Sequence, residues 1–195
     1  MKKIAITGNI GSGKTTISNM LLKGGFKVFQ CDKEISNLYS SKNLKERIRE
    51  SFNNKVKDLF FKNGQINKKV LSNYVFSSPV HLRKLEEIIY YYLEIIKNNF
   101  LVKNQKTSLV FFDIPLLFEK KQEDEYDHII YLVLNKKDQK IRVLKREGMD
   151  ENKLKNILKN QKDSSKSKKI SLLIDTNQKK TEIKKILFGF IKGLR

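Results

Sequence analysis

A glycine-rich segment near the start of the chain limits the possible folds more than any other feature. Residues 8–15 read GNIGSGKT, which fits the eight-position pattern G-x-x-x-x-G-K-[ST] of phosphate-binding loops. Such a loop needs a strand before it and a helix after it. Residues 4–6 are apolar, and apolar residues recur at helical spacing from Ile17 to Leu21. The segment therefore predicts an α/β fold that opens with a strand, this loop and a helix.

The residue types of this loop also indicate its ligand. Its glycines let successive amide groups point at one phosphate, and the dipole of the following helix favours the same anion. Lys14 supplies a mobile cation for the outer phosphates, and the Thr15 hydroxyl is a ligand for Mg²⁺. We therefore predict a nucleoside triphosphate site rather than a turn that only joins two elements. Its residues are Gly11, Ser12, Gly13, Lys14, Thr15 and Thr16.

Hydrophobic patterning predicts a parallel sheet covered by helices on both faces. Five short apolar or β-branched runs alternate with helical patterns, as in other α/β folds. These runs are residues 4–7, 27–30, 109–114, 128–134 and 171–175. The predicted helices after the first one are residues 33–39, 44–52, 68–76, 79–100, 136–146, 151–161 and 178–190. We predict a core of residues 1–32 and 107–195 and a helical insert of residues 33–106.

Composition narrows the function classes. The net charge of the 195 residues is +20, but 35 of the 41 basic residues are lysines spread along the chain. Specific recognition of nucleic acids usually relies on arginine, so we predict no nucleic-acid partner. No segment is long and apolar enough for a signal peptide or a membrane span, and Cys31 is the only cysteine. We therefore expect a cytoplasmic protein without a membrane partner, a disulfide or a thiolate metal cluster.

One aromatic group is ambiguous from sequence. It comprises Tyr90, Tyr91, Tyr92, Phe52, Phe60, Phe61 and Phe76. Such residues can stack on bases, but at helical spacing they more often form a core, and we predict a core.

Two carboxylates and two arginines are further candidates for the site at the loop. Asp32 and Asp113 follow predicted strands at the edge where sites of parallel sheets form. Asp32 can accept a proton from a hydroxyl, hold Mg²⁺ or cap the helix predicted from residue 33, and Asp113 competes for the metal or acceptor role. Arg142 and Arg146 are predicted on one helix face, where both reach one polyphosphate. A small phosphate-loop domain with a helical insert has the plan of a small-molecule kinase.

Five segments of the chain resemble the dephospho-coenzyme A kinase family. The family's opening T-G-G-I-G-S-G-K-[ST]-T appears as TGNIGSGKTT at residues 7–16, and its D-A-D appears as QCD at residues 30–32. Its D-[IVL]-P-L-L-[FY]-E appears as DIPLLFE at residues 113–119. Its G-x-[IL]-[DN]-R-x-x-L and V-F appear at residues 64–71 and 75–76. Its lid pattern Q-x-x-R-x-x-x-R falls on Gln139, Arg142 and Arg146, and a later glutamine matches Gln161.

The resemblance implies a P-loop kinase fold with a substrate-binding insert and a helical lid at about residues 136–169. It implies that ATP phosphorylates the ribose 3′-hydroxyl of dephospho-coenzyme A, giving coenzyme A and ADP, with Mg²⁺ as the cofactor. The implied catalytic residues are Asp32, Lys14, Arg142 and Arg146. The implied acceptor contacts are Thr7, Asp32, Lys68, Pro115, Leu116 and Glu119, and the metal ligand is Thr15, with Asp32 as a second candidate.

The chain departs from the family pattern at several positions. Gln30 and Lys68 replace an aspartate and an arginine, Tyr90 and Tyr91 stand where the family usually has His-Pro, and residues 171–177 match loosely. Two alternatives stay open. One is another P-loop kinase, for nucleosides or nucleoside monophosphates, and the other is a basic nucleic-acid-binding protein with a vestigial loop.

Overall fold

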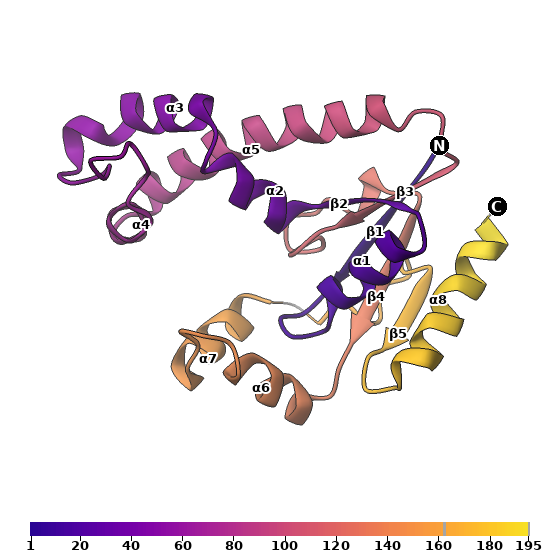
Figure 1. The fold of residues 1–195 in the computed structure, drawn as a ribbon. Helices are drawn as coiled ribbons and strands as arrows, with labels where there is room; N and C mark the ends of the chain where they lie inside the picture. The colour runs from indigo at the N-terminus through magenta and orange to yellow at the C-terminus, as the bar shows by residue number, and fades with distance from the viewer. Residues whose placement is uncertain (162, 195) are drawn as a thin grey trace. The chain divides into compact units, whose positions relative to one another are not determined.

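The computed structural model describes residues 1–161 and 163–194 and divides into two compact units (Figure 1). The first unit comprises Met1–Gln30 and Asn104–Arg195, and the second comprises Cys31–Lys103. The sequence places the insert at residues 33–106, and the second unit occupies residues 31–103. No helix of the described residues is both long enough and apolar enough to cross a bilayer.

A five-stranded parallel sheet forms the centre of the first unit. Its strands are β1 (Lys2–Gly8), β2 (Lys27–Gln30), β3 (Leu109–Asp113), β4 (His128–Val133) and β5 (Leu172–Asp175). They are arranged in the order β2-β3-β1-β4-β5, and all four neighbouring pairs are parallel. This confirms the five predicted strands, whose ends differ from the prediction by at most two residues.

One face of the sheet packs on two helices, α1 (Lys14–Lys23) and α8 (Lys180–Leu194). Alternate residues of the strands point to this face, among them Ile4 and Ile6 of β1. They meet apolar residues spaced three or four apart on the helices, such as Ile17 and Leu21 of α1. β1 is buried on both faces, which is expected of a central strand in a parallel sheet. The end of β1, where the glycine-rich loop begins, is therefore buried and paired with a strand on each side.

A pair of helices follows β4 in the first unit. They are α6 (Lys136–Leu144) and α7 (Glu151–Asn160). Asp150 caps α7, since its carboxylate accepts from the Lys153 N–H at 2.8 Å. α6 ends two residues earlier than predicted, because the chain turns after Leu144 and Gly148 adopts a φ of 71°. A short 3₁₀ helix, η2 (Glu123–Glu125), precedes β4.

The second unit is helical, as predicted for the insert. It contains α2 (Cys31–Leu38), α3 (Lys42–Phe52), the 3₁₀ helix η1 (Asn53–Lys55), α4 (Lys68–Phe76) and α5 (Pro79–Lys103). α2, α3 and α4 all contact the long helix α5. Ser41 and Asn67 cap α3 and α4 with side-chain oxygens, and Pro79 occupies the first position of α5.

The prediction of an aromatic core in this unit is wrong for most of the group. Phe52 is buried, but Phe76 and Tyr91 expose 72% and 64% of their surface, and Phe61 and Tyr90 are also exposed. For the tyrosines the reason is helical geometry: three consecutive tyrosines cannot share one face of α5, whose buried residues are Leu85, Ile88 and Leu93.

Candidate active site

The glycine-rich loop joins β1 to α1 through backbone conformations that favour glycine. Gly11 and Gly13 have φ values of 81° and 91°, and Gly13 is the residue before the first turn of α1. A Cβ atom on Gly11 would lie 2.8 Å from Val143 Cγ2, so α6 packs directly on the loop. Within the described part of the chain no side-chain hydrogen bond caps the N-terminus of α1, the end of a helix at which anions bind.

Lys14 lies across this loop. Its ammonium donates to the Gly8 carbonyl at 2.6 Å and to the Asn9 carbonyl at 3.4 Å. These contacts hold a positive charge against the backbone of the loop, whose residue Gly13 directly precedes α1. The arrangement suits a phosphate that would lie between the amides and the ammonium.

Two hydroxyls and a carboxylate lie on or beside the first turns of α1. Thr15 is exposed in the first turn, and Ser18 follows three residues later on the same side of the helix. The buried Ser18 hydroxyl donates at 2.8 Å to Asp113 Oδ2, at the end of β3. Among residues 1–161 and 163–194, no group of three or more His, Cys, Asp or Glu side chains could hold a metal. A hydroxyl and one carboxylate fit Mg²⁺, which usually binds few protein ligands together with phosphates and water.

Arg142 of α6 is held beside the loop by Thr176, which follows β5. Its Nη2 donates to the Thr176 carbonyl at 2.8 Å, and its Nη1 donates to the Thr176 hydroxyl at 3.4 Å. That hydroxyl donates in turn to the Val133 carbonyl at 3.1 Å. Arg142 Nη1 also lies 3.9 Å from the point where a Cβ of Gly13 would be. The guanidinium is therefore fixed at the edge of the loop.

The second predicted arginine, Arg146, lies outside α6. Arg146 is exposed and comes two residues after the end of α6, so the prediction that both arginines share one helix face is wrong. The helix ends because the Arg146 N–H bonds to the Val143 carbonyl at 3.0 Å and the chain continues through turns.

A motif that we did not identify in the sequence lies at the start of α6. Residues 135–138 read NKKD and fit the N-K-x-D pattern with which GTPases read guanine. In the structure Asn135 Oδ1 accepts from the Asp138 N–H at 2.8 Å, and the Asn135 amide donates to Asp138 Oδ2 at 2.7 Å. The amide also donates to Asn177 Oδ1 at 2.6 Å. The two motif side chains bond to each other, and Asn135 acts as the N-cap of α6.

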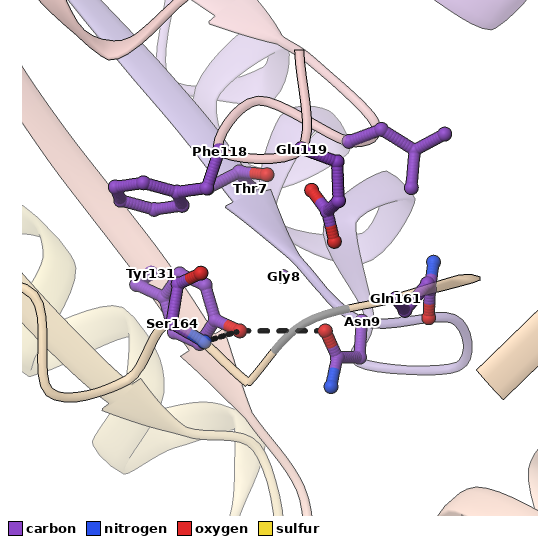
Figure 2. A pocket seen from close by; sticks show the side chains of 9 residues that line it. Thr7, Gly8, Asn9, Phe118, Glu119, Tyr131, Gln161 and Ser164 are labelled. Carbon is purple, nitrogen blue, oxygen red and sulfur yellow. Dashed lines mark hydrogen bonds between the residues drawn. The ribbon is translucent and has the colours of Figure 1, made fainter. Parts of the chain in front are cut away.

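A small pocket opens next to the first residues of the loop (Figure 2). Three predicted acceptor contacts, Thr7, Leu116 and Glu119, line it, whereas Pro115 does not. The other lining residues are Gly8 and Asn9 of the predicted loop, Phe118 of the segment 113–119, Gln161, and also Tyr131 and Ser164, which we did not predict. Sequence alternation in β4 offers one signal, because Tyr131 points to the opposite face of the sheet from Ile130 and Leu132.

Tyr131 connects the loop to the segment after α7. Its hydroxyl donates to Asn9 Oδ1 at 3.3 Å and accepts from the Ser164 N–H at 3.3 Å (Figure 2). Burial raises the pKa of Tyr131, and the nearby carboxylates of Asp163 and Glu119 raise that pKa further. The phenol therefore stays protonated and remains a hydrogen-bond donor at neutral pH.

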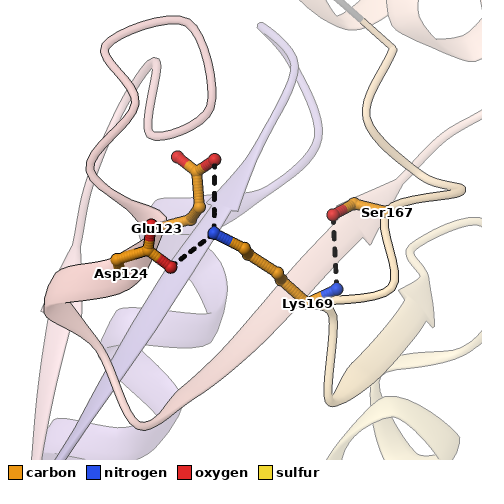
Figure 3. A network of polar contacts seen from close by, with 4 residues as sticks. All are labelled: Glu123, Asp124, Ser167 and Lys169. Carbon is orange, nitrogen blue, oxygen red and sulfur yellow. Dashed lines mark hydrogen bonds and ion pairs between the residues drawn. The ribbon is translucent and has the colours of Figure 1, made fainter.

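The segment between α7 and β5 is also anchored at its far end. The Lys169 ammonium contacts the carboxylates of Asp124 and Glu123 in η2, and the Lys169 N–H donates to Ser167 Oγ at 3.3 Å (Figure 3). The hydrogen bond to Asp124 raises the pKa of Lys169. Residues 164–169 are therefore tied to the core at both ends.

Two predicted site residues belong to the second unit. Asp32 is exposed in the first turn of α2, which begins at Cys31, so Asp32 is not the N-cap of a helix from residue 33. Along the chain it follows the end of β2, where Gln30 pairs with Asp113 of β3. The ammonium of Lys68, the first residue of α4, lies 4.8 Å from the centre of the Tyr39 ring.

Comparisons with known proteins match most of the chain. Residues 2–182 match the sequence model of the dephospho-CoA kinase family. A dephospho-CoA kinase of Fusobacterium nucleatum subsp. nucleatum is 34% identical over 176 residues, which cover 89% of either chain. The structure of TT1252 from Thermus thermophilus superposes with a TM-score of 0.83 at 25% identity, covering 98% of this chain and 96% of that one. A dephospho-CoA kinase structure from Campylobacter jejuni gives a TM-score of 0.69 at 20% identity, covering 99% and 97%.

Proposed function

Because the chain belongs to the dephospho-CoA kinase family, we propose that it transfers the γ-phosphoryl group of ATP to the ribose 3′-hydroxyl of dephospho-coenzyme A. The products are coenzyme A and ADP, so the reaction is the last step of coenzyme A biosynthesis. The observation that carries the proposal is the packing of α6 on the glycine-rich loop, which holds an arginine beside the phosphate-binding backbone. The lone cysteine, Cys31, cannot form a disulfide within the chain, which is compatible with the cytoplasmic location that we propose.

Positive charge and amide dipoles stabilise the transferred group in this proposal. The backbone of residues 11–16 binds the phosphates of ATP, and Lys14 lies against their outer oxygens. Arg142 and Arg146 neutralise the charge that spreads over the phosphoryl group during transfer. Arg142 needs little rearrangement, because Thr176 already holds its guanidinium next to Gly13.

The metal ligand that we propose is the Thr15 hydroxyl, with the carboxylates of Asp113 and Asp32 as further candidates. Mg²⁺ bound there would neutralise phosphate charge and orient the phosphates. Asp113 is well placed for this role within the first unit, because Ser18 holds its carboxylate against α1.

For Asp32 we propose the role of general base. Its carboxylate accepts the proton of the ribose 3′-hydroxyl as that oxygen attacks the γ-phosphorus. An Asp32→Asn protein keeps the size of the side chain but cannot accept the proton, so we expect turnover to fall by about 10²-fold or more. Near-normal turnover of a folded Asp32→Asn protein would remove Asp32 from this role.

Acceptor contacts in the proposal come from both units. In the first unit Thr7, Leu116 and Glu119 line the pocket beside the loop, and Pro115 lies in the same segment after β3. In the second unit Lys68 provides a cation for the phosphate groups of the acceptor. The pocket supports the proposal for Thr7, Leu116 and Glu119 alone.

An ADP-release assay tests the proposed activity. Dephospho-coenzyme A and a panel of nucleosides and nucleoside monophosphates are supplied in turn with ATP and Mg²⁺, and the Lys14→Ala protein serves as the inactive control. We expect turnover with dephospho-coenzyme A only, and mass spectrometry of the product should show one added phosphoryl group. Turnover with nucleosides or their monophosphates alone would overturn the proposal.

A further inference from the structure

Two glutamines, one from α6 and one that follows α7, hold consecutive peptide groups of the glycine-rich loop. Gln139 Nε2 of α6 donates to the Ile10 carbonyl at 2.9 Å. Gln161 Oε1, at the C-cap of α7, accepts from the Ile10 N–H at 2.9 Å. Both backbone groups of Ile10 are thus bonded to side chains that lie more than a hundred residues further along the chain.

These two bonds fix the directions of the neighbouring groups. All peptide bonds of the described residues are trans, so the C=O and N–H of each peptide point in opposite directions. Gln139 draws the Ile10 carbonyl toward α6, and the Gly11 N–H of the same peptide must therefore point away from α6. Gln161 draws the Ile10 N–H, and the Asn9 carbonyl of that peptide points away from Gln161. This carbonyl accepts from Lys14 Nζ at 3.4 Å and from the Ser12 N–H at 3.1 Å.

The bonds assign distinct roles to the two side chains. A backbone N–H only donates and a carbonyl only accepts, so Gln161 acts through its oxygen and Gln139 through its nitrogen. Gln139 is 8% exposed, and its neighbour on the same face of α6, Val143, packs against Gly11. The helix contact and the hydrogen bonds therefore act on the same part of the loop.

We propose that Gln139 and Gln161 are positioning residues that orient the loop for nucleotide binding, Gln139 as an obligatory donor and Gln161 as an obligatory acceptor. The inference rests on the proposed function only in taking the ligand to be ATP with Mg²⁺. Neither side chain needs to touch the nucleotide. Each sets the plane of one peptide whose other end faces the lysine or the phosphates.

Four substitutions separate these roles from simple packing. Methionine has nearly the length of glutamine and lacks the hydrogen-bonding groups, whereas glutamate keeps the acceptor and loses the donor at neutral pH. We expect Gln139→Met and Gln161→Met to weaken ATP binding about tenfold, the effect of a lost, partly buried hydrogen bond. Gln161→Glu should stay within about threefold of the wild type, and Gln139→Glu should be the weakest binder because its carboxylate faces a carbonyl.

Isothermal titration calorimetry of ATP with Mg²⁺, without any acceptor, provides the readout, and thermal melting verifies that each variant is folded. This binding measurement is independent of the acceptor, so it stands even if the chain does not phosphorylate dephospho-coenzyme A. Lowering the pH should strengthen ATP binding to the Gln139→Glu protein relative to the Gln161→Glu protein, because a protonated carboxyl regains a donor. Equal losses for the two glutamate variants, or binding of both methionine variants within twofold of the wild type, would overturn the proposal.

Discussion

The two ends of the α6–α7 pair differ in how they are held. The base, which we define as Gln139, Arg142 and Gln161, bonds to the glycine-rich loop or to Thr176. The tip, residues 145–149, is a turn with a glycine at positive φ, and Arg146 lies on this turn, whereas Arg142 lies in α6 and bonds to Thr176. Two arginines four residues apart in sequence therefore lie in different environments.

This difference suggests separate roles for two arginines to which the sequence pattern assigns the same role. An arginine fixed at the base is already oriented and loses little conformational freedom when a phosphate binds. An arginine on an exposed turn must be ordered at that moment, so its contribution depends on the position of the tip. We infer that Arg142 acts in nucleotide binding and in transfer, whereas Arg146 acts mainly in transfer.

Alanine variants of the two arginines should show the largest difference between the base and the tip. We expect Arg142→Ala to lower kcat by about 10²-fold or more and to weaken ATP binding about tenfold, since a fixed charge next to the phosphates is lost. Arg146→Ala should lower kcat by about tenfold to 10²-fold and leave ATP affinity within about threefold. Steady-state kinetics and calorimetry measure the two quantities.

Arginine-to-lysine variants at the same positions control for charge alone. Lysine lacks the planar fork whose two nitrogens bond to the hydroxyl and the carbonyl of Thr176, so Arg142→Lys should recover little, whereas Arg146→Lys should recover more. If Arg146→Ala weakened ATP binding as much as Arg142→Ala does, the distinction between base and tip would be wrong.

Changing the anchor instead of the arginine gives a smaller effect. Thr176→Val keeps the shape of the side chain but removes the hydroxyl that links Arg142 to the Val133 carbonyl. We expect kcat to fall about threefold to tenfold, because Arg142 keeps its bond to the Thr176 carbonyl. Thr176→Ser retains the hydroxyl and should restore the rate. Equal kcat values for the valine, serine and wild-type proteins would show that the hydroxyl does not position Arg142.

Changes to the helix caps should have the smallest effect, a change in stability that depends on pH. α6 at the base is capped by the amide of Asn135, and α7 is capped by the carboxylate of Asp150. The Lys153 N–H lowers the pKa of Asp150 below its ordinary 3.8. A lowered pKa means that this stabilisation is present above pH 3.8 and is lost as the pH falls through the lowered value.

Thermal melts from pH 7 to pH 3 compare the wild type with Asp150→Asn, whose amide also caps but does not titrate. We expect the melting temperature of the wild type to fall slightly more on acidification than that of the variant. An identical pH dependence of the two proteins would show that the Asp150 carboxylate does not stabilise α7.

The sequence predicted the elements and the loop because their signals are local. Glycines, Lys14 and Thr15 stand together in one segment, and the strands are marked by short apolar runs. The cap at Asp150 is a local feature of the same kind, since it acts on a residue three positions away. The end of α6 was missed because several of the following residues are compatible with a helix and only the turns around Gly148 end it.

What the sequence could not predict depends on contacts between distant segments. Gln139 and Gln161 matched a family pattern, but their bonds to Ile10 span 129 and 151 residues and leave no local signal. The same holds for the link from Tyr131 to Asn9 and Ser164. For the aromatic residues of α5 the sequence predicted burial that the structure does not have. Apolar character alone does not show which face of a helix is covered.

The strand order has a consequence for synthesis of the chain on the ribosome. β1 and β2 emerge first, but they are not neighbours: β2 pairs only with β3, and β1 pairs with β3 and β4. No two of the five strands can pair until residues 109–113 have been made, by which time the whole second unit has been synthesised. The nascent chain must therefore carry two unpaired, apolar strands through the synthesis of an entire helical unit, a period in which they are exposed to aggregation or to chaperones.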